Sequence, residues 1–186
     1  MFGMMTKDNG SANALDLLKR DHEAVDAMFR QYEEIKDDAG DAEKMQLVAQ
    51  ICEALTVHAQ IEEQIFYPAA RRALQGEEDK DLLDEAAVEH QTLKDIIGRL
   101  EAAPAKDPLY DAGVKVLSEY VKHHVKEEEN ELFPKVRGSG LDLQAIGQEL
   151  AARKEQLEAR GSRASSGGTG RGSRRGSESR AVRGTH

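Results

Sequence analysis

The sequence predicts an all-α protein: an antiparallel up-down-up-down four-helix bundle with an additional short C-terminal helix and a disordered basic tail. Apolar residues recur at alternating spacings of three and four in four stretches, which is the period of a helix with one buried face. Short segments rich in turn residues separate these stretches. Aromatic residues make up only 4% of the chain and tryptophan is absent, which favours a helical core of aliphatic residues over a β-sandwich.

The first two helices follow a leader at residues 1–12. We call the row of residues on the buried face of a helix its seam. The seam of the first helix comprises Leu15, Leu18, His22, Val25, Phe29 and Tyr32. We expect Asp41 to cap the second helix, Pro68 to weaken it and Gly76 to end it. The seam of the second comprises Val48, Ile51, Leu55, His58, Glu62 and Ile65. Polar residues therefore occupy buried positions in both helices.

The third helix is expected to begin around residues 79–81. Its seam comprises Leu83, Ala86, His90, Leu93, Ile97 and Leu100. Asp107 followed by Pro108 is a start signal for the fourth helix, because Asp caps free amides and Pro loses no hydrogen bond at the first position. The seam of the fourth comprises Val114, Leu117, Val121, His124 and Glu128. Four helices with short connections favour an antiparallel bundle.

The C-terminal part of the chain changes in composition. Residues 141–160 predict a short amphipathic helix on the outside of the bundle, so the domain spans 13–160. Residues 161–186 are mostly Gly, Ser and Arg, with six arginines against one glutamate and a net charge of +5, and too few apolar residues to fold. Of the overall charge of −9, residues 1–160 therefore carry −14. An acidic bundle argues against nucleic-acid binding, while the tail suits a solubilising linker or weak contact with a polyanion.

The cysteine count limits the chemistry. Cys52 is the only cysteine, so an intrachain disulfide and a thiolate metal cluster are both excluded, and metal ligands must be His, Asp or Glu. We read Cys52 as a small core residue. The sequence has no run of about 20 apolar residues and no signal-peptide pattern, so we expect a cytoplasmic protein that does not bind membranes.

A repeated motif points to metal binding. His58-x-x-x-Glu62 and His124-x-x-x-Glu128 are each followed by a second glutamate, and by a proline ten residues after the histidine. Residues four apart lie on one face of a helix, so each copy presents an imidazole and a carboxylate to the same point. This geometry suits a metal ion, and it occurs twice.

Six polar seam residues form the candidate metal site. They are His22, His58, Glu62, His90, His124 and Glu128. The paired spacings of the histidines, 36 and 34 residues, indicate two similar hairpins that bring all four to one level of the core. One buried histidine is usually a hydrogen-bonded core residue, but two buried carboxylates among four imidazoles would be costly without bound cations. Such ligands suit iron, manganese or zinc, and a carboxylate from each side can bridge two metals.

We expect other polar residues near the seam to have different roles. Pro68 stands ten residues after His58, and Pro134 stands ten residues after His124. This spacing selects His124 as the ligand and makes His123 a flanking residue. Three glutamates are predicted to be solvated surface charges: Glu63, Glu127 and Glu129. Glu131 is a candidate to accept the second ring proton of a histidine. Asp26 offers the same geometry, although an exposed charge is the simpler interpretation.

The order His, His-x-x-x-Glu, His, His-x-x-x-Glu resembles the hemerythrin-like family of HHE cation-binding domains, over about residues 14–136. Residues 141–157 also resemble a segment that many bacterial members carry. The resemblance implies a four-helix bundle around two non-haem irons, rather than zinc or manganese. It implies that His22 and His58 bind one iron, that His90 and His124 bind the other, and that two carboxylates bridge them: Glu62 and Glu128.

One departure from that family bears on function. Oxygen-carrying hemerythrins usually add a fifth histidine one turn after the third-helix ligand, whereas His90 is followed by Leu93 and Lys94 at those places. The irons would then be more open, which places peroxide or nitric oxide chemistry and sensing beside oxygen carriage. A ferritin-like di-iron protein is the nearest rival, but no histidine here follows a glutamate by three residues, as Glu-x-x-His requires.

The sequence therefore predicts a hemerythrin-like di-iron protein that binds or senses dioxygen or a related small molecule such as peroxide or nitric oxide. The first alternative is an enzyme that disproportionates peroxide or reduces a small oxidant. The second is a storage or structural site for iron or zinc. No flavin site is evident, so sustained reductive turnover would require a partner protein.

Overall fold

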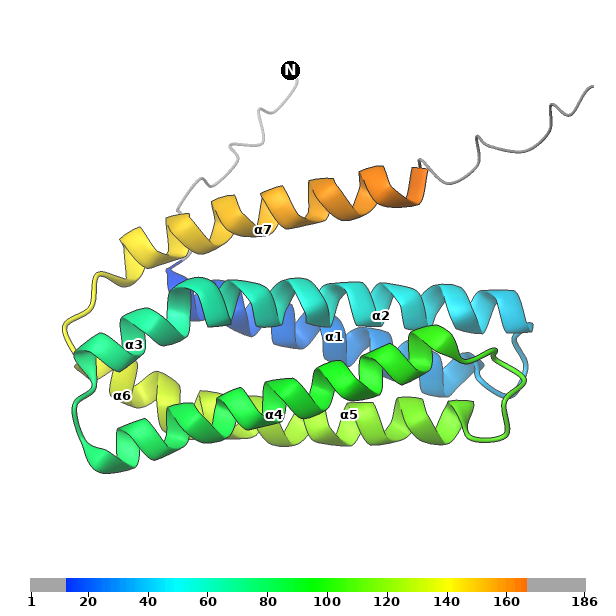
Figure 1. Ribbon diagram of the computed structural model, residues 1–186, viewed down its shortest axis with the longest axis horizontal. Helices are drawn as coiled ribbons and strands as arrows, with labels where there is room; N and C mark the ends of the chain where they lie inside the picture. The colour runs from blue at the N-terminus through cyan, green and yellow to red at the C-terminus, as the bar shows by residue number, and fades with distance from the viewer. Residues whose placement is uncertain (1–12, 167–186) are drawn as a thin grey trace, which may run out of the picture.

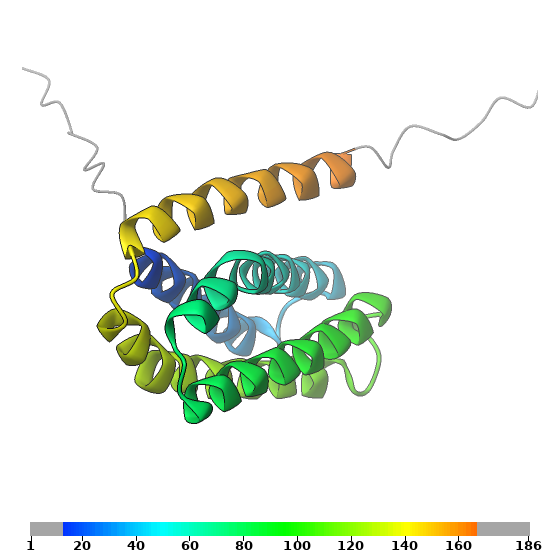
Figure 2. The same cartoon turned by 60° about the vertical axis from the view of Figure 1, so that its left-hand side comes forward.

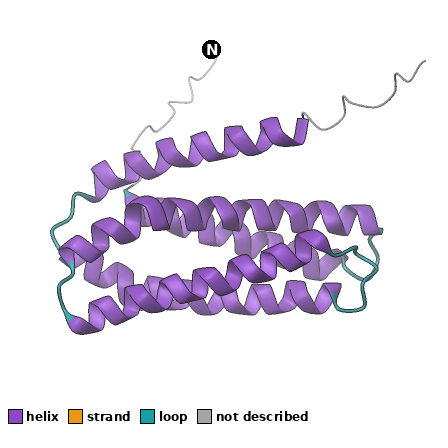
Figure 3. Ribbon diagram, viewed as in Figure 1, coloured by secondary structure: helices purple, strands orange, loops and turns teal. Residues whose placement is uncertain are grey.

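The computed structural model describes residues 13–166, with side chains through Gly161. All secondary structure in this range is helical (Figure 3). The elements are α1 (Ala14–Ile35), α2 (Asp41–Ile61), η1 (Glu62–Phe66), α3 (Tyr67–Ala73), α4 (Glu77–Ala102), α5 (Tyr110–Glu127), η2 (Glu128–Leu132), α6 (Phe133–Gly138) and α7 (Leu143–Ser166). The predicted leader and residues 167–186 of the predicted tail lie outside the described range.

Four long helical rods run antiparallel, as predicted (Figure 1). The segments α2, η1 and α3 follow one another without a break and form one rod, and α5, η2 and α6 form another. Helix α1 packs along α2, and α4 packs along α5, so the bundle consists of two hairpins. The expected fold class is therefore confirmed. None of the helices within residues 13–166 is both long enough and apolar enough to cross a bilayer.

The observed helix ends differ from the predicted ones by a few residues. Gly40, and not Asp41, is the N-cap of α2, and α4 begins at Glu77. Helix α5 begins at Tyr110, after a turn in which Asp107 accepts a hydrogen bond from the Leu109 amide at 2.8 Å. Helix α1 has a side-chain cap, because Asn13 accepts from the Asp16 amide. These differences leave the seam residues in their predicted register.

Two π-helical turns, η1 and η2, interrupt the second and fourth rods. The amide of Tyr67 donates to the carbonyl of Glu62, five residues earlier, and the amide of Phe133 donates to that of Glu128. A proline follows each of these aromatic residues. Proline has no amide proton, and its ring clashes with the carbonyl four residues earlier in a regular α-helix, so a wider turn suits this position. Pro68 therefore widens the helix and does not end it.

The apolar core is divided into two clusters along the bundle. One contains Leu15, Leu18, Ile61, Phe66, Leu83 and Phe133, among others. The other contains Val25, Phe29, Ile51, Leu93, Leu117 and Val121, among others. The four seam histidines and two seam glutamates occupy the level between the clusters, and all six are buried. Cys52 lies in the second cluster as a buried residue.

Helix α7 lies outside the bundle against α1 and α2 (Figures 1 and 2). Its position was predicted, but its length was underestimated, because it extends beyond Arg160 to Ser166. Ile146 and Leu150 are buried in the first apolar cluster. Near its end, a Cβ on Gly161 would come within 2.5 Å of a Glu53 oxygen, so α7 still approaches α2 closely there. Contact with the bundle thus continues past the apolar pattern that marked the predicted end.

We expect Leu150→Ala to lower the free energy of unfolding by about 2–5 kcal/mol, because it leaves a cavity where a fully buried side chain had been. Urea unfolding followed by circular dichroism measures this. The control is Leu109→Ala, the same change at a residue that is 74% exposed, with an expected effect of about 0.5 kcal/mol or less. Equal effects of the two substitutions would show that α7 is not seated on the bundle in solution.

Candidate metal centre

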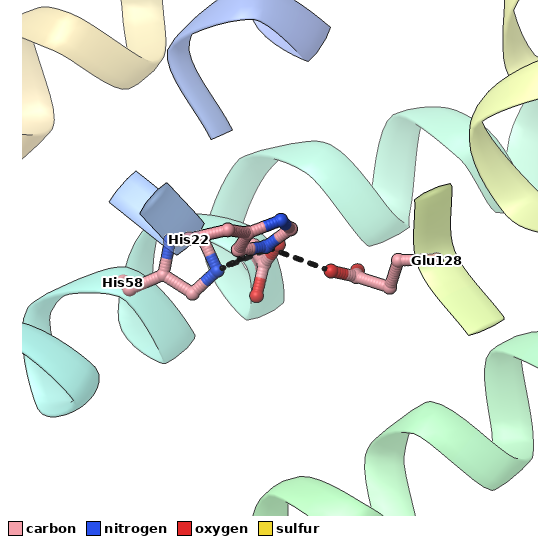
Figure 4. Close-up of side chains that lie close together, drawn as sticks. His22, His58 and Glu128 are labelled. Carbon is pink, nitrogen blue, oxygen red and sulfur yellow. Dashed lines mark hydrogen bonds and ion pairs between the residues drawn. The ribbon is translucent and has the colours of Figure 1, made fainter. Parts of the chain in front are cut away.

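The six seam residues singled out in the sequence converge at one point in the bundle. Each rod contributes one histidine, and the two π turns contribute the glutamates. The Nε2 atoms of His22 and His58 lie 3.1 Å apart, and those of His90 and His124 lie 3.0 Å apart. Figure 4 shows the first pair, with the Glu128 carboxylate beside it. The histidines thus form two pairs whose Nε2 atoms face inward.

The two glutamates each span both histidine pairs. The Glu62 oxygens lie 3.2 Å from His58 Nε2 and 3.4 Å from His90 Nε2. The Glu128 Oε2 atom lies 3.2 Å from His22 Nε2 and 3.6 Å from His124 Nε2. A carboxylate placed in this way can share its oxygens between two metal ions, one beside each pair.

The donor atoms fit bound cations. Among the described residues, both oxygens of Glu62 and Oε2 of Glu128 are buried without a hydrogen-bond partner. A buried carboxylate oxygen without a partner is costly, and such atoms are rare in native proteins. In the part of the chain that the structure describes, two buried sets of donor atoms lie close enough together to hold an ion, one around His22 and His58 and one around His90 and His124. Imidazole nitrogens and carboxylate oxygens suit iron, manganese or zinc.

A second set of carboxylates holds the outward nitrogen of every histidine. The Nδ1 atoms are 2.9 Å from Glu129 at His22, 3.5 Å from Asp21 at His58, 2.9 Å from Glu63 at His90 and 2.8 Å from Glu89 at His124. A carboxylate at Nδ1 keeps the proton there, so the Nε2 lone pair faces the centre of the site. All four imidazoles are therefore oriented for coordination.

Several of these carboxylates were assigned differently from the sequence. Glu63 and Glu129 are not simply solvated charges, because each contacts a histidine from a neighbouring rod. Asp26 pairs with Arg30 at 3.2 Å, and Glu131 is exposed, so neither is among the described Nδ1 partners. The sequence did hold a signal for the four Nδ1 partners, which is their position next to the seam residues. Each of them directly follows a seam glutamate or directly precedes a seam histidine.

Lys94 and His123 contact this second set of carboxylates. Lys94 Nζ lies 2.6 and 2.7 Å from the two oxygens of Glu63, so the residue at the place of a fifth histidine holds a carboxylate instead. His123 is exposed and lies 3.4 Å from Glu89, the partner of His124. The structure thus places His124 in the cluster and His123 outside it, in the register that the proline spacing gave.

Tyr67 breaks the symmetry between the two halves of the site. Its phenol donates to Glu128 Oε1 at 2.8 Å and lies 3.2 Å from His90 Nε2. The equivalent residue of the second repeat is Phe133, which stacks on His22 with ring centroids 6.0 Å apart. This explains why one oxygen of Glu128 has a partner while neither oxygen of Glu62 has one. The sequence reasoning missed Tyr67, although its place before Pro68 matches that of Phe133 before Pro134.

Burial and charge shift the pKa values of the site in opposite directions. Burial lowers the pKa of His58, but the charge of Glu62 and contacts with carboxylates outweigh burial and raise it to about 10. The same balance, led by Glu128, raises the pKa of His124 to about 9. Burial raises the pKa of Glu62, yet the neighbouring imidazoles lower it well below its usual value. The charges of the glutamates and the imidazoles therefore oppose the effect of burial on each other's pKa.

A small cavity borders the histidines on the side of the second apolar cluster. Its volume is about 20 Å³, and nearly all of its surface is apolar. All four histidines line it, together with aliphatic residues that include Val25, Leu55, Leu93, Ile97 and Val121. A cavity volume of about 10–15 Å³ is enough for one water molecule, so this cavity suits a molecule of two or three atoms.

Comparison with known proteins agrees with the fold and with a cation-binding domain. The family model of the hemerythrin HHE cation-binding domain matches residues 13–136. A solved structure of such a domain-containing protein from Mycobacterium kansasii, a homolog of Rv2633c, matches with a TM-score of 0.68 and 26% identity. The match covers 86% of this chain and 95% of that one.

Two curated relatives are similar at the level of sequence. The uncharacterized protein Rv2633c of Mycobacterium tuberculosis is 29% identical over 148 residues, which cover 78% of this chain and 87% of that protein. A protein named DNA nickase from Nostoc sp. is 29% identical over 157 residues, or 82% of this chain, but the match spans only 42% of that longer protein. The family model matches from the first rod to the fourth, and the matched range contains the buried His/Glu cluster. This chain therefore belongs to the hemerythrin HHE cation-binding family.

Proposed function

We propose that the protein holds two non-haem iron ions and uses them to bind or sense dioxygen or a related small molecule such as peroxide or nitric oxide. The observation that carries this proposal is that each buried glutamate spans both histidine pairs. His22 and His58 would hold one ion, and His90 and His124 the other. Glu62 and Glu128 would bridge them. Bound iron would supply reversible changes of oxidation state and an affinity for small ligands.

The surrounding residues support this choice of ligand. The cavity beside the histidines is too small for an organic substrate and has an apolar wall, which suits a diatomic molecule. The ammonium group of Lys94 is held by both oxygens of Glu63, so it is not free to enter the cavity. With no histidine at that place, the position next to His90 is left for an exogenous ligand, which favours peroxide or nitric oxide chemistry, or sensing, over simple carriage.

The enzymatic alternative, disproportionation of peroxide or reduction of a small oxidant, is favoured by Tyr67. Burial and the charges of Glu128 and Glu62 raise the pKa of this phenol well above 10, so it retains its proton. The hydroxyl lies at the level of the histidines and donates to Glu128. It is therefore a hydrogen-bond donor beside the histidines, at the place where a reduced oxygen species would carry negative charge.

Metal analysis of the purified protein, combined with optical spectra before and after oxygen and peroxide, tests the proposal. We expect about two irons per chain and an oxo-bridged spectrum. In Glu62→Ala and Glu128→Ala, the iron content should fall to one per chain or less, because a shared ligand is lost. Glu127→Ala, a neighbouring glutamate outside the cluster, should keep both ions. One redox-silent zinc in the wild type would overturn the di-iron proposal.

Tyr67→Phe should make the two halves of the site alike, because phenylalanine already stands at the equivalent position 133. We expect both metals to remain bound and the optical spectrum to shift, since Glu128 loses its only phenol partner. If the chain disproportionates peroxide, the rate should fall by about 10²–10³-fold, the usual cost of losing a hydrogen-bond donor that stabilises developing charge. An unchanged spectrum and an unchanged rate would exclude a role for the phenol.

Metal affinity should rise with pH. At neutral pH the metal-free protein holds protons on His58 and His124, and a metal ion must displace them. Without metal, these raised pKa values stabilise the fold most at pH values below about 6.5, and this contribution is lost as pH rises towards 9–10. Thermal unfolding with and without metal from pH 6 to 9 measures both trends. A stabilisation by metal that does not grow with pH would contradict this account.

A further inference from the structure

Each of the four carboxylates that hold the histidines also contacts a basic side chain. Glu63 pairs with Lys94, Glu129 pairs with Lys19 at 3.6 Å, and Glu89 contacts His123. These three basic residues belong to the rods of the bundle. The fourth carboxylate, Asp21, pairs with Lys154, which belongs to α7. Helix α7 lies beyond residues 13–136, the range that matches the family domain.

We propose that Lys154 is a positioning residue of the metal centre, through which α7 sets the orientation of His58. This inference rests on the proposed metal binding by His58. The ammonium group of Lys154 contacts Asp21 Oδ1, and Asp21 Oδ2 lies 3.5 Å from His58 Nδ1. Two polar contacts, both made by Asp21, thus join a helix outside the bundle to a candidate ligand inside it.

Charge holds the ammonium group of Lys154, which contacts Asp21 and lies 3.9 Å from an oxygen of Glu158. Two open cavities, of about 300 and 630 Å³, border this part of α7, and both are lined by Asp21 and Lys154. The apolar contacts of α7 flank Lys154: Leu150 is buried one turn earlier, and Leu157 packs against the first cluster three residues later. The side chain of Lys154 is 30% exposed and that of Asp21 only 12%, so the pair joins a solvated cation to a nearly buried anion.

Asp21 depends on this cation more than its counterparts depend on theirs. It makes the longest of the four contacts with a histidine, 3.5 Å against 2.8–2.9 Å for the others. Aspartate also has a shorter side chain than glutamate, so its carboxylate has less reach. With Lys154 removed, Asp21 would be free to turn towards the water in the adjoining cavities, and His58 would lose its partner at Nδ1.

Lys154→Met tests the proposal, because methionine keeps the apolar stem and removes the charge. With ferrous iron as the probe, we expect a chromogenic chelator to remove iron about tenfold faster than from wild type, together with a shift in the optical spectrum. Lys154→Arg should restore both properties. Arg153→Met is the matched control, since Arg153 bonds Gln64 at 2.8 Å and makes no described contact with Asp21.

A double-mutant cycle shows whether Lys154 acts through Asp21. In an Asp21→Asn background, Lys154→Met should add less than twofold to the rate of iron release. Equal rates for Lys154→Met and Arg153→Met would overturn the proposal, as would full additivity with Asp21→Asn. The metal-free protein provides a separate readout: the Nδ1 proton of His58, followed by ¹⁵N NMR, should exchange with water faster in Lys154→Met. A wild type that binds no iron would refute the proposed function, whereas an unchanged exchange rate would refute the role of Lys154.

Discussion

The burial of two carboxylates among four imidazoles is the constraint on which the rest of this structure depends. Glu62 and Glu128 are at most 2% exposed, and a charge this deep in a protein is tolerated only when it is compensated. The compensation is built in layers: imidazoles around the carboxylates, further carboxylates at the outer ring nitrogens, and basic side chains beyond those. Each layer is nearer to water than the one inside it. The apolar core is consequently split into two clusters, one on each side of the polar level.

The internal repeat gives the site an approximate twofold symmetry, and Tyr67 and Lys154 disturb it. Tyr67 places a hydroxyl beside the His90–His124 pair, while Phe133 places an apolar ring beside His22. Lys154 adds a contact from α7 to the His58 side alone. The two donor sets also differ, because both glutamates join the set of His22 and His58, whereas only Glu62 joins the set of His90 and His124. Two ions held in this site would therefore have different surroundings.

The fold and the six central residues could be predicted because helical periodicity links sequence directly to position. Residues three and four apart share a face, so histidines and glutamates on apolar seams had to meet in the core. The outer contacts were harder to predict, since Glu63 and Glu129 reach histidines on neighbouring rods and depend on how those rods are rotated. Lys154 could not be predicted either, because its contact with Asp21 depends on how α7 packs on the bundle. Tyr67 was missed because a regular α-helix would turn a residue five positions after Glu62 away from the site.

The π turns also affect how the sequence can vary. In each, a hydrogen bond spans five residues, so the glutamate at the start and the aromatic residue after the turn both face the bundle interior. Deleting one residue from η1 would place Tyr67 four positions after Glu62, so the two residues would still share one face of an ordinary α-helix. The same deletion would remove the wide turn that accommodates the ring of Pro68. We therefore expect the extra residue and the proline to be kept or lost together among relatives of this chain.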